Sequence, residues 1–223
     1  MITSNVYTRV FHLKYGEGTG TCFAIDFDKK QYLITAKHVI EGLHDGDRVE
    51  FYHENKWITL PVKVVGHHKT ADVSVISINQ KLAEFPLEPS IVGLTYGQDL
   101  YFLGFPYRLV NEVNNKINRN FPLPLVKKGI LSAMLNDEQG NYFLIDGINN
   151  PGFSGGPVVY KLPNQNDFRI AGIISGYKSA NEPIYQGEIE LPLNVRANTG
   201  IVIAYNIENA LELIRVNPIG VDI

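Results

Sequence analysis

Short runs of apolar and aromatic residues, bounded by Gly, Pro, Asn or Asp, recur along most of the chain. Runs of this length are typical of the β-strands of sandwiches and barrels. The strands expected on this basis are 21–26, 31–35, 48–53, 56–65, 73–78, 99–104, 126–135, 141–145, 157–161, 169–177 and 200–204. Because no helical pattern separates consecutive runs, a parallel βαβ sheet is disfavoured and the chain is predicted to be all-β.

Two segments depart from the strand pattern and show helical spacing. The longer one is 206–216, where apolar residues from Ile207 to Ile214 recur on one helical face. Asn206 is a suitable N-cap for this helix, which we expect to dock on the surface of a barrel. A single helical turn is expected at 36–41.

The segment 107–125 is rich in asparagine and ends in two closely spaced prolines, which predicts a long loop. Long ordered loops often act as lids or gates over a functional site. A surface insertion fits the same composition, so the pattern leaves both interpretations open.

Composition places the chain among ordinary globular proteins and excludes some partners. The 223 residues suit one domain, and 44% hydrophobic with 19% charged residues allow a substantial core. A net charge of −3 with scattered Lys and Arg offers no basic surface, so nucleic acid is not expected as a partner. No apolar run has the length of a membrane span, and no signal-peptide pattern begins the chain, so no membrane partner is expected. A single cysteine, Cys22, excludes an internal disulfide and favours a cytoplasmic location.

The strongest local signal is the glycine-rich segment 149–157, which surrounds Ser154. A nucleophilic serine needs an exposed hydroxyl and two backbone N–H groups that converge on the attacked carbonyl, and small residues permit this turn. Gly152 and Ser154 are the candidate donors of this oxyanion hole. Taken alone, the segment also fits a glycine-rich hairpin turn with an incidental serine.

Two further residues complete a candidate catalytic group. His38 follows an apolar strand at the start of a turn, where an imidazole can accept the serine proton and return it to the leaving group. Asp72 directly precedes an alternating apolar strand, and a partly buried carboxylate there needs a partner such as an imidazole N–H. We therefore predict His38 as general base, Asp72 as its orienting residue and Ser154 as nucleophile.

In this order the segments resemble the trypsin-like peptidases, and especially the HtrA-type (Deg) branch. The segments that carry the resemblance are 18–25, 33–39, 71–76, 146–157, 172–176 and 200–204. The chain order His, Asp, Ser is that of the chymotrypsin-like fold and differs from that of subtilisins and α/β-hydrolases. The resemblance implies two six-stranded antiparallel β-barrels, at about 1–95 and 96–205, followed by the C-terminal helix. It also implies a serine endopeptidase that forms an acyl-enzyme on a protein or peptide substrate and uses no cofactor.

The resemblance also assigns a substrate site. The residue six positions before the nucleophile contributes to the base of the family's primary specificity pocket, and here it is Ile148. An apolar base predicts small or medium aliphatic P1 residues in place of Lys or Arg. The segment Ile174, Ser175 and Gly176 resembles the strand that pairs with substrate, and Tyr177 either narrows the pocket or packs on the surface.

Two departures from the family pattern bear on regulation. Phe153 precedes the nucleophile, where digestive enzymes have an aspartate and HtrA-type enzymes usually an asparagine, so activation by N-terminal cleavage is not implied. Phe153 is expected to set the conformation of the oxyanion loop by packing. The chain ends soon after the expected helix, so we expect no PDZ domain in it.

Three alternatives remain beside the peptidase. A protease-like binding or sensing module with a latent or inactive site fits the same residues, and an esterase or other acyl transferase shares the same chemistry. A metal site built on His67 and His68 with Cys22 or Asp72 is disfavoured, because adjacent histidines on a strand point to opposite faces. We expect no metal, and the sequence does not define the oligomeric state.

Overall fold

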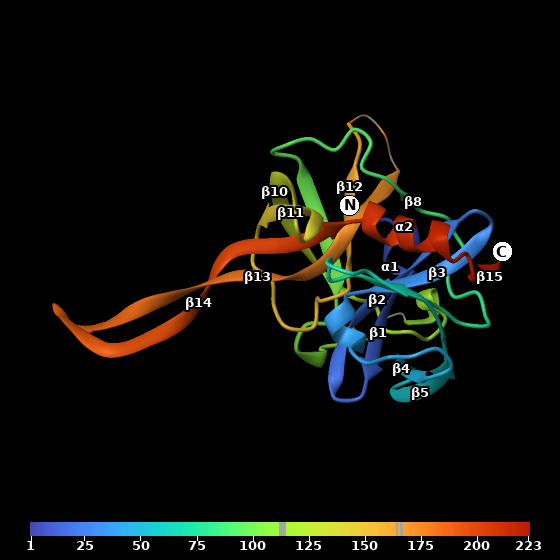
Figure 1. Cartoon of the computed structure of the whole chain (residues 1–223), viewed down its shortest axis with the longest axis horizontal. Helices are drawn as coiled ribbons and strands as arrows, with labels where there is room; N and C mark the ends of the chain where they lie inside the picture. The colour runs from blue at the N-terminus through green and yellow to red at the C-terminus, as the bar shows by residue number, and fades with distance from the viewer. Residues whose placement is uncertain (112–114, 164, 166) are drawn as a thin grey trace.

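The computed structural model describes residues 1–111, 115–163, 165 and 167–223, whose strands form two sheets that pack against each other (Figure 1). The first sheet has the order β5-β4-β1-β2-β3-β7-β6, with every neighbouring pair antiparallel. Its strands are β1 (Val10–Tyr15), β2 (Gly18–Phe27), β3 (Lys30–Thr35), β4 (Arg48–His53), β5 (Lys56–Pro61), β6 (Lys63–His67) and β7 (Ser74–Ser77). Only Val62 separates the two end strands, β5 and β6, so the sheet curls back on itself.

The second sheet closes into a ring. Its strands are β8 (Glu88–Pro89), β9 (Asp99–Gly104), β10 (Leu125–Asp137), β11 (Gly140–Asp146), β12 (Pro157–Lys161), β13 (Phe168–Gln186) and β14 (Ile189–Asn206). The order β12-β9-β10-β11-β14-β13 is completed by pairing of β12 with β13, so six antiparallel strands form a barrel. The short strand β8 adds to β13 in parallel. The predicted all-β class is confirmed.

Each sheet encloses its own core, and a third cluster lies where the two meet. Leu13, Ile40 and Phe51 belong to the core of the first sheet, and Phe102 and Phe143 to that of the second. The third cluster joins side chains of both sheets and of the C-terminal helix. Burial of these apolar residues fixes the sheets relative to each other, which matters because loops from both sheets carry the candidate site.

The C-terminal helix α2 (Glu208–Val216) docks on the protein as the sequence predicts. Its apolar face, including Leu211 and Ile214, is buried in the cluster shared by the two sheets. The Asn206 side-chain oxygen accepts the Glu208 backbone N–H at 2.9 Å, which satisfies a free donor at the helix start. After the helix, β15 (Val221–Asp222) returns to pair with β3 of the first sheet.

Strands β13 and β14 are much longer than the runs 169–177 and 200–204 expected from sequence. They continue together beyond the barrel as a hairpin that projects from the molecule (Figure 1). We call residues 178–199 of this hairpin the arm. All residues from 181 to 190 are exposed, so the outer arm contributes no core.

The loop expected at 107–125 lies partly outside the described residues, at 112–114. Two short 3-10 helices flank that gap, η2 (Pro106–Arg108) and η3 (Asn115–Asn118). Phe121 then packs edge-on against Phe11 of the first sheet, with ring centroids 4.9 Å apart. The short helix α1 (Ser4–Tyr7) completes the elements, and among the described residues no helix has the length and apolar character needed to cross a bilayer.

Candidate active site

His38 and Asp72 are brought together by two neighbouring loops of the first sheet. His38 lies in the 3-10 helix η1 (Lys37–Ile40) directly after β3, and Asp72 precedes β7, which pairs with β3. The Asp72 Oδ1 atom accepts the His38 backbone N–H at 2.9 Å, and Oδ2 lies 2.6 Å from His38 Nδ1. One carboxylate therefore fixes both the backbone and the ring of His38, which leaves Nε2 as the free ring nitrogen.

The electrostatics of this pair match its geometry. The hydrogen bond to Asp72 raises the pKa of His38 above its ordinary value, against the opposing effect of partial burial. Burial alone would raise the pKa of Asp72, but hydrogen bonds from His38 and Ser175 hold the pKa of the carboxyl below its ordinary value. Asp72 therefore stays ionised at neutral pH, and its charge favours the protonated imidazole.

Ser154 lies in the loop between β11 and β12 of the second sheet. Its hydroxyl donates to the Ser175 backbone oxygen at 3.0 Å. The Ser175 hydroxyl in turn donates to Asp72 Oδ2 at 2.6 Å. Ser175 thus connects the serine of one sheet with the aspartate of the other, while the described contacts include no hydrogen bond between Ser154 and His38.

The glycines beside Ser154 are required by the close approach of neighbouring backbone. A Cβ atom on Gly155, which has φ +83°, would lie 2.1 Å from the Thr21 backbone oxygen. A Cβ on Gly156 would lie 2.0 Å from the Leu103 backbone oxygen. Since Thr21 belongs to the first sheet and Leu103 to the second, these two positions let the serine loop sit between the sheets.

The expected oxyanion-hole donors, the N–H groups of Gly152 and Ser154, donate to no backbone acceptor within the described chain. Gly152 has φ +105°, and a Cβ there would lie 2.3 Å from the Phe105 backbone oxygen, so only glycine fits. Between the two donors, the Phe153 N–H is occupied by the Asn150 backbone oxygen at 3.2 Å. In the described structure the N–H groups of Gly152 and Ser154 therefore have no backbone acceptor, whereas the Phe153 N–H between them is hydrogen-bonded.

Phe153 is fully buried, and its ring packs edge-on against Phe102 at 5.2 Å between centroids. Lys127 approaches the same ring at 5.7 Å and donates through Nζ to the Ile148 backbone oxygen at 2.6 Å and to Asn150 Oδ1 at 2.5 Å. Burial lowers the pKa of Lys127. Phe153 and Lys127 thus hold the loop 148–154, which carries the candidate oxyanion-hole donors and is called the oxyanion loop. The local sequence indicates neither how deeply Phe153 is buried nor which atoms Lys127 contacts.

A pocket of about 370 Å³ opens beside Ser154. Its lining residues are Asn149, Asn150, Pro151, Ser154, Ser175, Gly176, Tyr177 and Arg196. Of the expected substrate-binding residues, Ser175 and Gly176 lie in this pocket, as does Tyr177.

The other two expected substrate-binding residues lie elsewhere. Ile174 is fully buried in the core of the second barrel, where its backbone pairs with Gly155 and Gly156. Ile148 is 51% exposed and lines no part of the pocket beside Ser154. Arg196 does line this pocket, and the sequence interpretation missed it because it reaches the pocket only through the pairing of β13 with β14.

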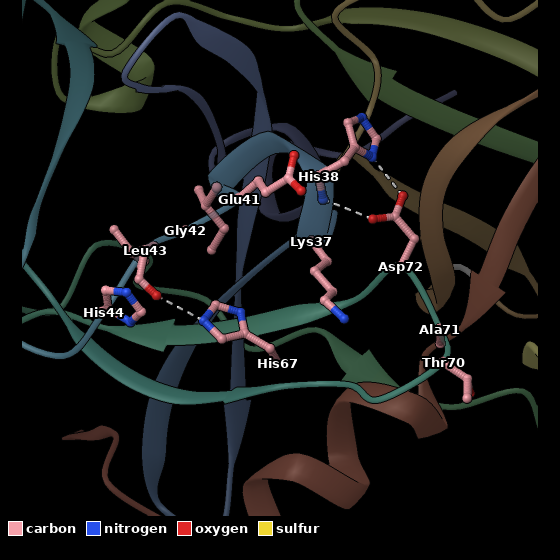
Figure 2. Close-up of a pocket in the computed structure, with 11 residues that line it drawn as sticks. Lys37, His38, Glu41, Gly42, Leu43, His44, His67, Thr70, Ala71 and Asp72 are labelled. Carbon is pink, nitrogen blue, oxygen red and sulfur yellow. Dashed lines mark hydrogen bonds and ion pairs between the residues drawn. The ribbon is translucent and has the colours of Figure 1, made fainter.

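A second pocket, of about 440 Å³, has His38 and Asp72 among its lining residues (Figure 2). Ser154 is not among them. The pocket is lined by the segment from Lys37 to His44 together with residues of 67–72. His67 points into this region, with Nε2 3.0 Å from the Leu43 backbone oxygen and Nδ1 2.7 Å from Ser74 Oγ. Both ring nitrogens of His67 are thereby engaged within the protein, and the part of the chain that the structure describes holds no cluster of three potential metal ligands.

The two curled antiparallel sheets have the arrangement of the chymotrypsin-like fold. A histidine–aspartate pair lies on one sheet, and a serine surrounded by glycines lies on the other. The family model for the trypsin-like peptidase domain matches residues 18–162. The chain therefore belongs to the trypsin-like peptidase family.

Solved structures with the same fold include two of the HtrA-type protease AlgW with tripeptide. Each has a TM-score of 0.62 and 21% sequence identity to this chain. The alignment covers 95% of this chain and 60% of each AlgW chain, so the protein spans less than two thirds of the length of these neighbours. The comparison with curated proteins gave no match.

Proposed function

We propose that the protein is a serine endopeptidase that hydrolyses peptide bonds in protein or peptide substrates through an acyl-enzyme. The observation that carries this proposal is the hydrogen-bonded chain from His38 through Asp72 and Ser175 to Ser154. It connects four segments that are separate in sequence and belong to two sheets. Family membership supports the same chemistry.

In the proposed reaction, His38 Nε2 accepts the Ser154 hydroxyl proton while Ser154 Oγ attacks the scissile carbonyl. Asp72 holds the proton on Nδ1 and stabilises the imidazolium that forms. The N–H groups of Gly152 and Ser154 receive the negative oxygen of the tetrahedral intermediate. His38 then gives its proton to the leaving amine, and a water molecule, activated by the same base, hydrolyses the acyl-enzyme.

The contact between the Ser154 hydroxyl and the Ser175 backbone oxygen describes a resting state. For attack, the hydroxyl must leave this oxygen and turn toward His38. The same contact favours the second candidate function, a binding or sensing module whose catalytic site is latent. The preference for small or medium aliphatic P1 residues, inferred from the position of Ile148 six residues before Ser154, stays a prediction.

Labelling with a fluorophosphonate probe, followed by mass spectrometry, tests the proposal. The wild type should be labelled on Ser154, and Ser154→Ala should lose both the label and all peptide cleavage. Ser132→Ala removes another serine that is exposed on β10 and should keep both. A wild type that resists the probe and leaves peptides uncut, with and without added peptide, would contradict the peptidase and favour the binding module.

A further inference from the structure

The pocket beside Ser154 combines polar walls with one cation. Asn149, Asn150 and Ser175 contribute polar groups, Tyr177 an aromatic face and Arg196 a guanidinium, and no carboxylate lines the pocket. This composition differs from the apolar pocket expected from Ile148. It indicates a ligand group with hydrogen-bond acceptors and negative charge.

The register of the arm explains why Arg196 faces the pocket. Arg196 pairs with Asn181, and Asn198 pairs with Ser179, so these four residues occupy the same face of the hairpin. The Asn198 side-chain nitrogen donates to the Asn149 backbone oxygen at 2.8 Å, which places this face against the oxyanion loop. Arg196 Nε donates to Ser179 Oγ at 2.9 Å, so the base of the guanidinium is held on the same face.

The charge of Arg196 is not balanced within the part of the chain that the structure describes. None of its nitrogens lies within ion-pair distance of a carboxylate there, although Arg9, Arg119, Arg169 and Arg215 all have such partners. Only Nε is used, by Ser179. The two terminal nitrogens of the guanidinium are therefore available for a bidentate contact with a carboxylate.

A second cation lies under the same loop. Lys127 contacts the Ile148 backbone oxygen and Asn150 Oδ1, and it too has no carboxylate within ion-pair distance in the described structure. Lys127 does not itself line the pocket, and Ser175, which does, donates to the Asp72 carboxylate at 2.6 Å. Arg196 is thus the one charged side chain among the described lining residues, although the net charge of the whole chain is −3. The positive charge of Arg196 therefore favours the binding of acidic groups in this pocket.

From these observations we infer that the pocket selects an acidic P1 side chain, glutamate or aspartate, through Arg196. This inference rests on the proposed function, because P1 is defined only for a substrate that Ser154 attacks. Arg196 acts as a specificity-determining residue and takes no part in the bond-breaking steps. Asn149, whose amide can present either its oxygen or its nitrogen, also lines the pocket.

The test compares cleavage of four peptides that differ only at P1, with Glu, Gln, Leu or Lys. Gln has nearly the shape of Glu without its charge, so the Glu-to-Gln ratio of kcat/KM isolates the ion pair. We expect a ratio of about ten in the wild type, the size of a charge-assisted hydrogen bond that is partly exposed. Added salt should lower the ratio, since the arginine is accessible to solvent.

Two variants of Arg196 sharpen the comparison. Arg196→Gln should bring the Glu-to-Gln ratio close to one, and Arg196→Glu should make Lys the better P1 residue. Arg48→Gln removes an exposed arginine of β4 in the first sheet and should keep the wild-type ratio. A wild type that cleaves after Glu no faster than after Gln, or a preference that survives in Arg196→Gln, would overturn the inference. A preference for Leu over Glu would also overturn the inference, and it would support the prediction made from Ile148.

The failure of the peptidase proposal has a different signature. If no peptide is cleaved in a Ser154-dependent manner, the proposed function fails, and the pocket is tested by binding alone. Fluorescence anisotropy of the Glu and Gln peptides, truncated after P1 and amidated, then measures affinity for the Ser154→Ala protein. Tighter binding of the Glu peptide, lost in the Ser154→Ala, Arg196→Gln double variant, supports an acid-selective pocket, and equal affinities refute it.

Discussion

Acid should destabilise the folded protein through His12, a histidine of β1 that takes no part in the candidate site. The residue is 2% exposed, and neither ring nitrogen has a hydrogen-bond partner within the described structure. Its ring stacks on Phe105 at 4.9 Å and meets the edge of Trp57 at 4.9 Å. Burial, together with the charge of Arg108, lowers the pKa of His12 from 6.5 to about 4.

The size of the effect follows from this difference. Above pH 6.5 the ring is neutral in both states, so His12 contributes no pH dependence there. Below pH 6.5 the His12 ring binds a proton in the unfolded chain but stays neutral in the folded protein. The free energy of unfolding therefore falls progressively until about pH 4. The full loss is about 3 kcal/mol, of which about 2 kcal/mol is reached at pH 5.

Urea unfolding at pH 8 and pH 5, for the wild type and for His12→Phe, measures this contribution. Phenylalanine keeps the aromatic packing and removes two buried polar atoms without partners, so the variant should be at least as stable as the wild type at pH 8. At pH 5 it should exceed the wild type by about 2 kcal/mol more than at pH 8. The raised pKa of His38 contributes with the opposite sign, but it is common to both proteins and cancels in the comparison.

The matched control is His44→Gln, which removes an exposed histidine and should leave the acid destabilisation in place. Equal pH dependence in the wild type and His12→Phe would refute the reasoning. It would mean that the protein accommodates a protonated His12 at little cost, for example by moving the Phe105 and Trp57 rings apart to admit water.

Two other predictions concern the site and the arm. Because Asp72 raises the pKa of His38, kcat/KM should rise with pH through an apparent pKa above 6.5, and Asp72→Asn should lower both the rate and that apparent pKa, as measured by peptide hydrolysis from pH 5 to 9. Replacing 182–195 by an Asn-Gly turn joins the paired residues Asn181 and Arg196. This replacement should change the free energy of unfolding by less than about 0.5 kcal/mol and keep the P1 preference, since nearly every residue removed is exposed. A loss of several kcal/mol in urea unfolding would show that the outer arm supports the barrel.

The pairing of His38 with Asp72 was accessible from sequence because each lies next to a strand of the first sheet. Strands 31–35 and 73–78 are marked by apolar residues, and once they pair, the loops that follow one and precede the other meet at the same edge. The role of Ser175 could be predicted from the sequence only in part. Its segment was expected to face substrate, whereas the hydroxyl contact with Asp72 depends on how the second sheet approaches the first.

The arm and Arg196 could not be predicted from hydrophobic pattern. The expected strands end at 177 and begin again at 200, and the outer arm between them buries neither face although it carries apolar residues such as Ile189, Leu193 and Val195. Arg196 is 42 positions from Ser154, and it reaches the pocket only because a two-stranded ribbon holds it in register with Asn181. The Ile148 prediction stays untested, and spacing from the nucleophile does not reveal what the neighbouring hairpin contributes to the pocket wall.

A hydrogen bond links the loop that carries Gly152 to the strand that carries Arg196, the proposed P1 determinant. Binding of a P1 side chain at Arg196 is therefore expected to affect the conformation of the proposed oxyanion hole. Asn198, two positions from Arg196 on the same strand, bonds to the Asn149 backbone oxygen, and Gly152 and Phe153 follow only a few residues later. The Phe153 ring is anchored in the core, so the loop can adjust mainly between its two fixed ends, at Asn149 and Phe153. A P1 carboxylate that draws Arg196 toward the pocket would therefore act on the segment that carries the Gly152 donor. In the proposed peptidase, the candidate P1 determinant and the candidate oxyanion donor are thus joined by one short stretch of backbone, from Asn149 to Gly152.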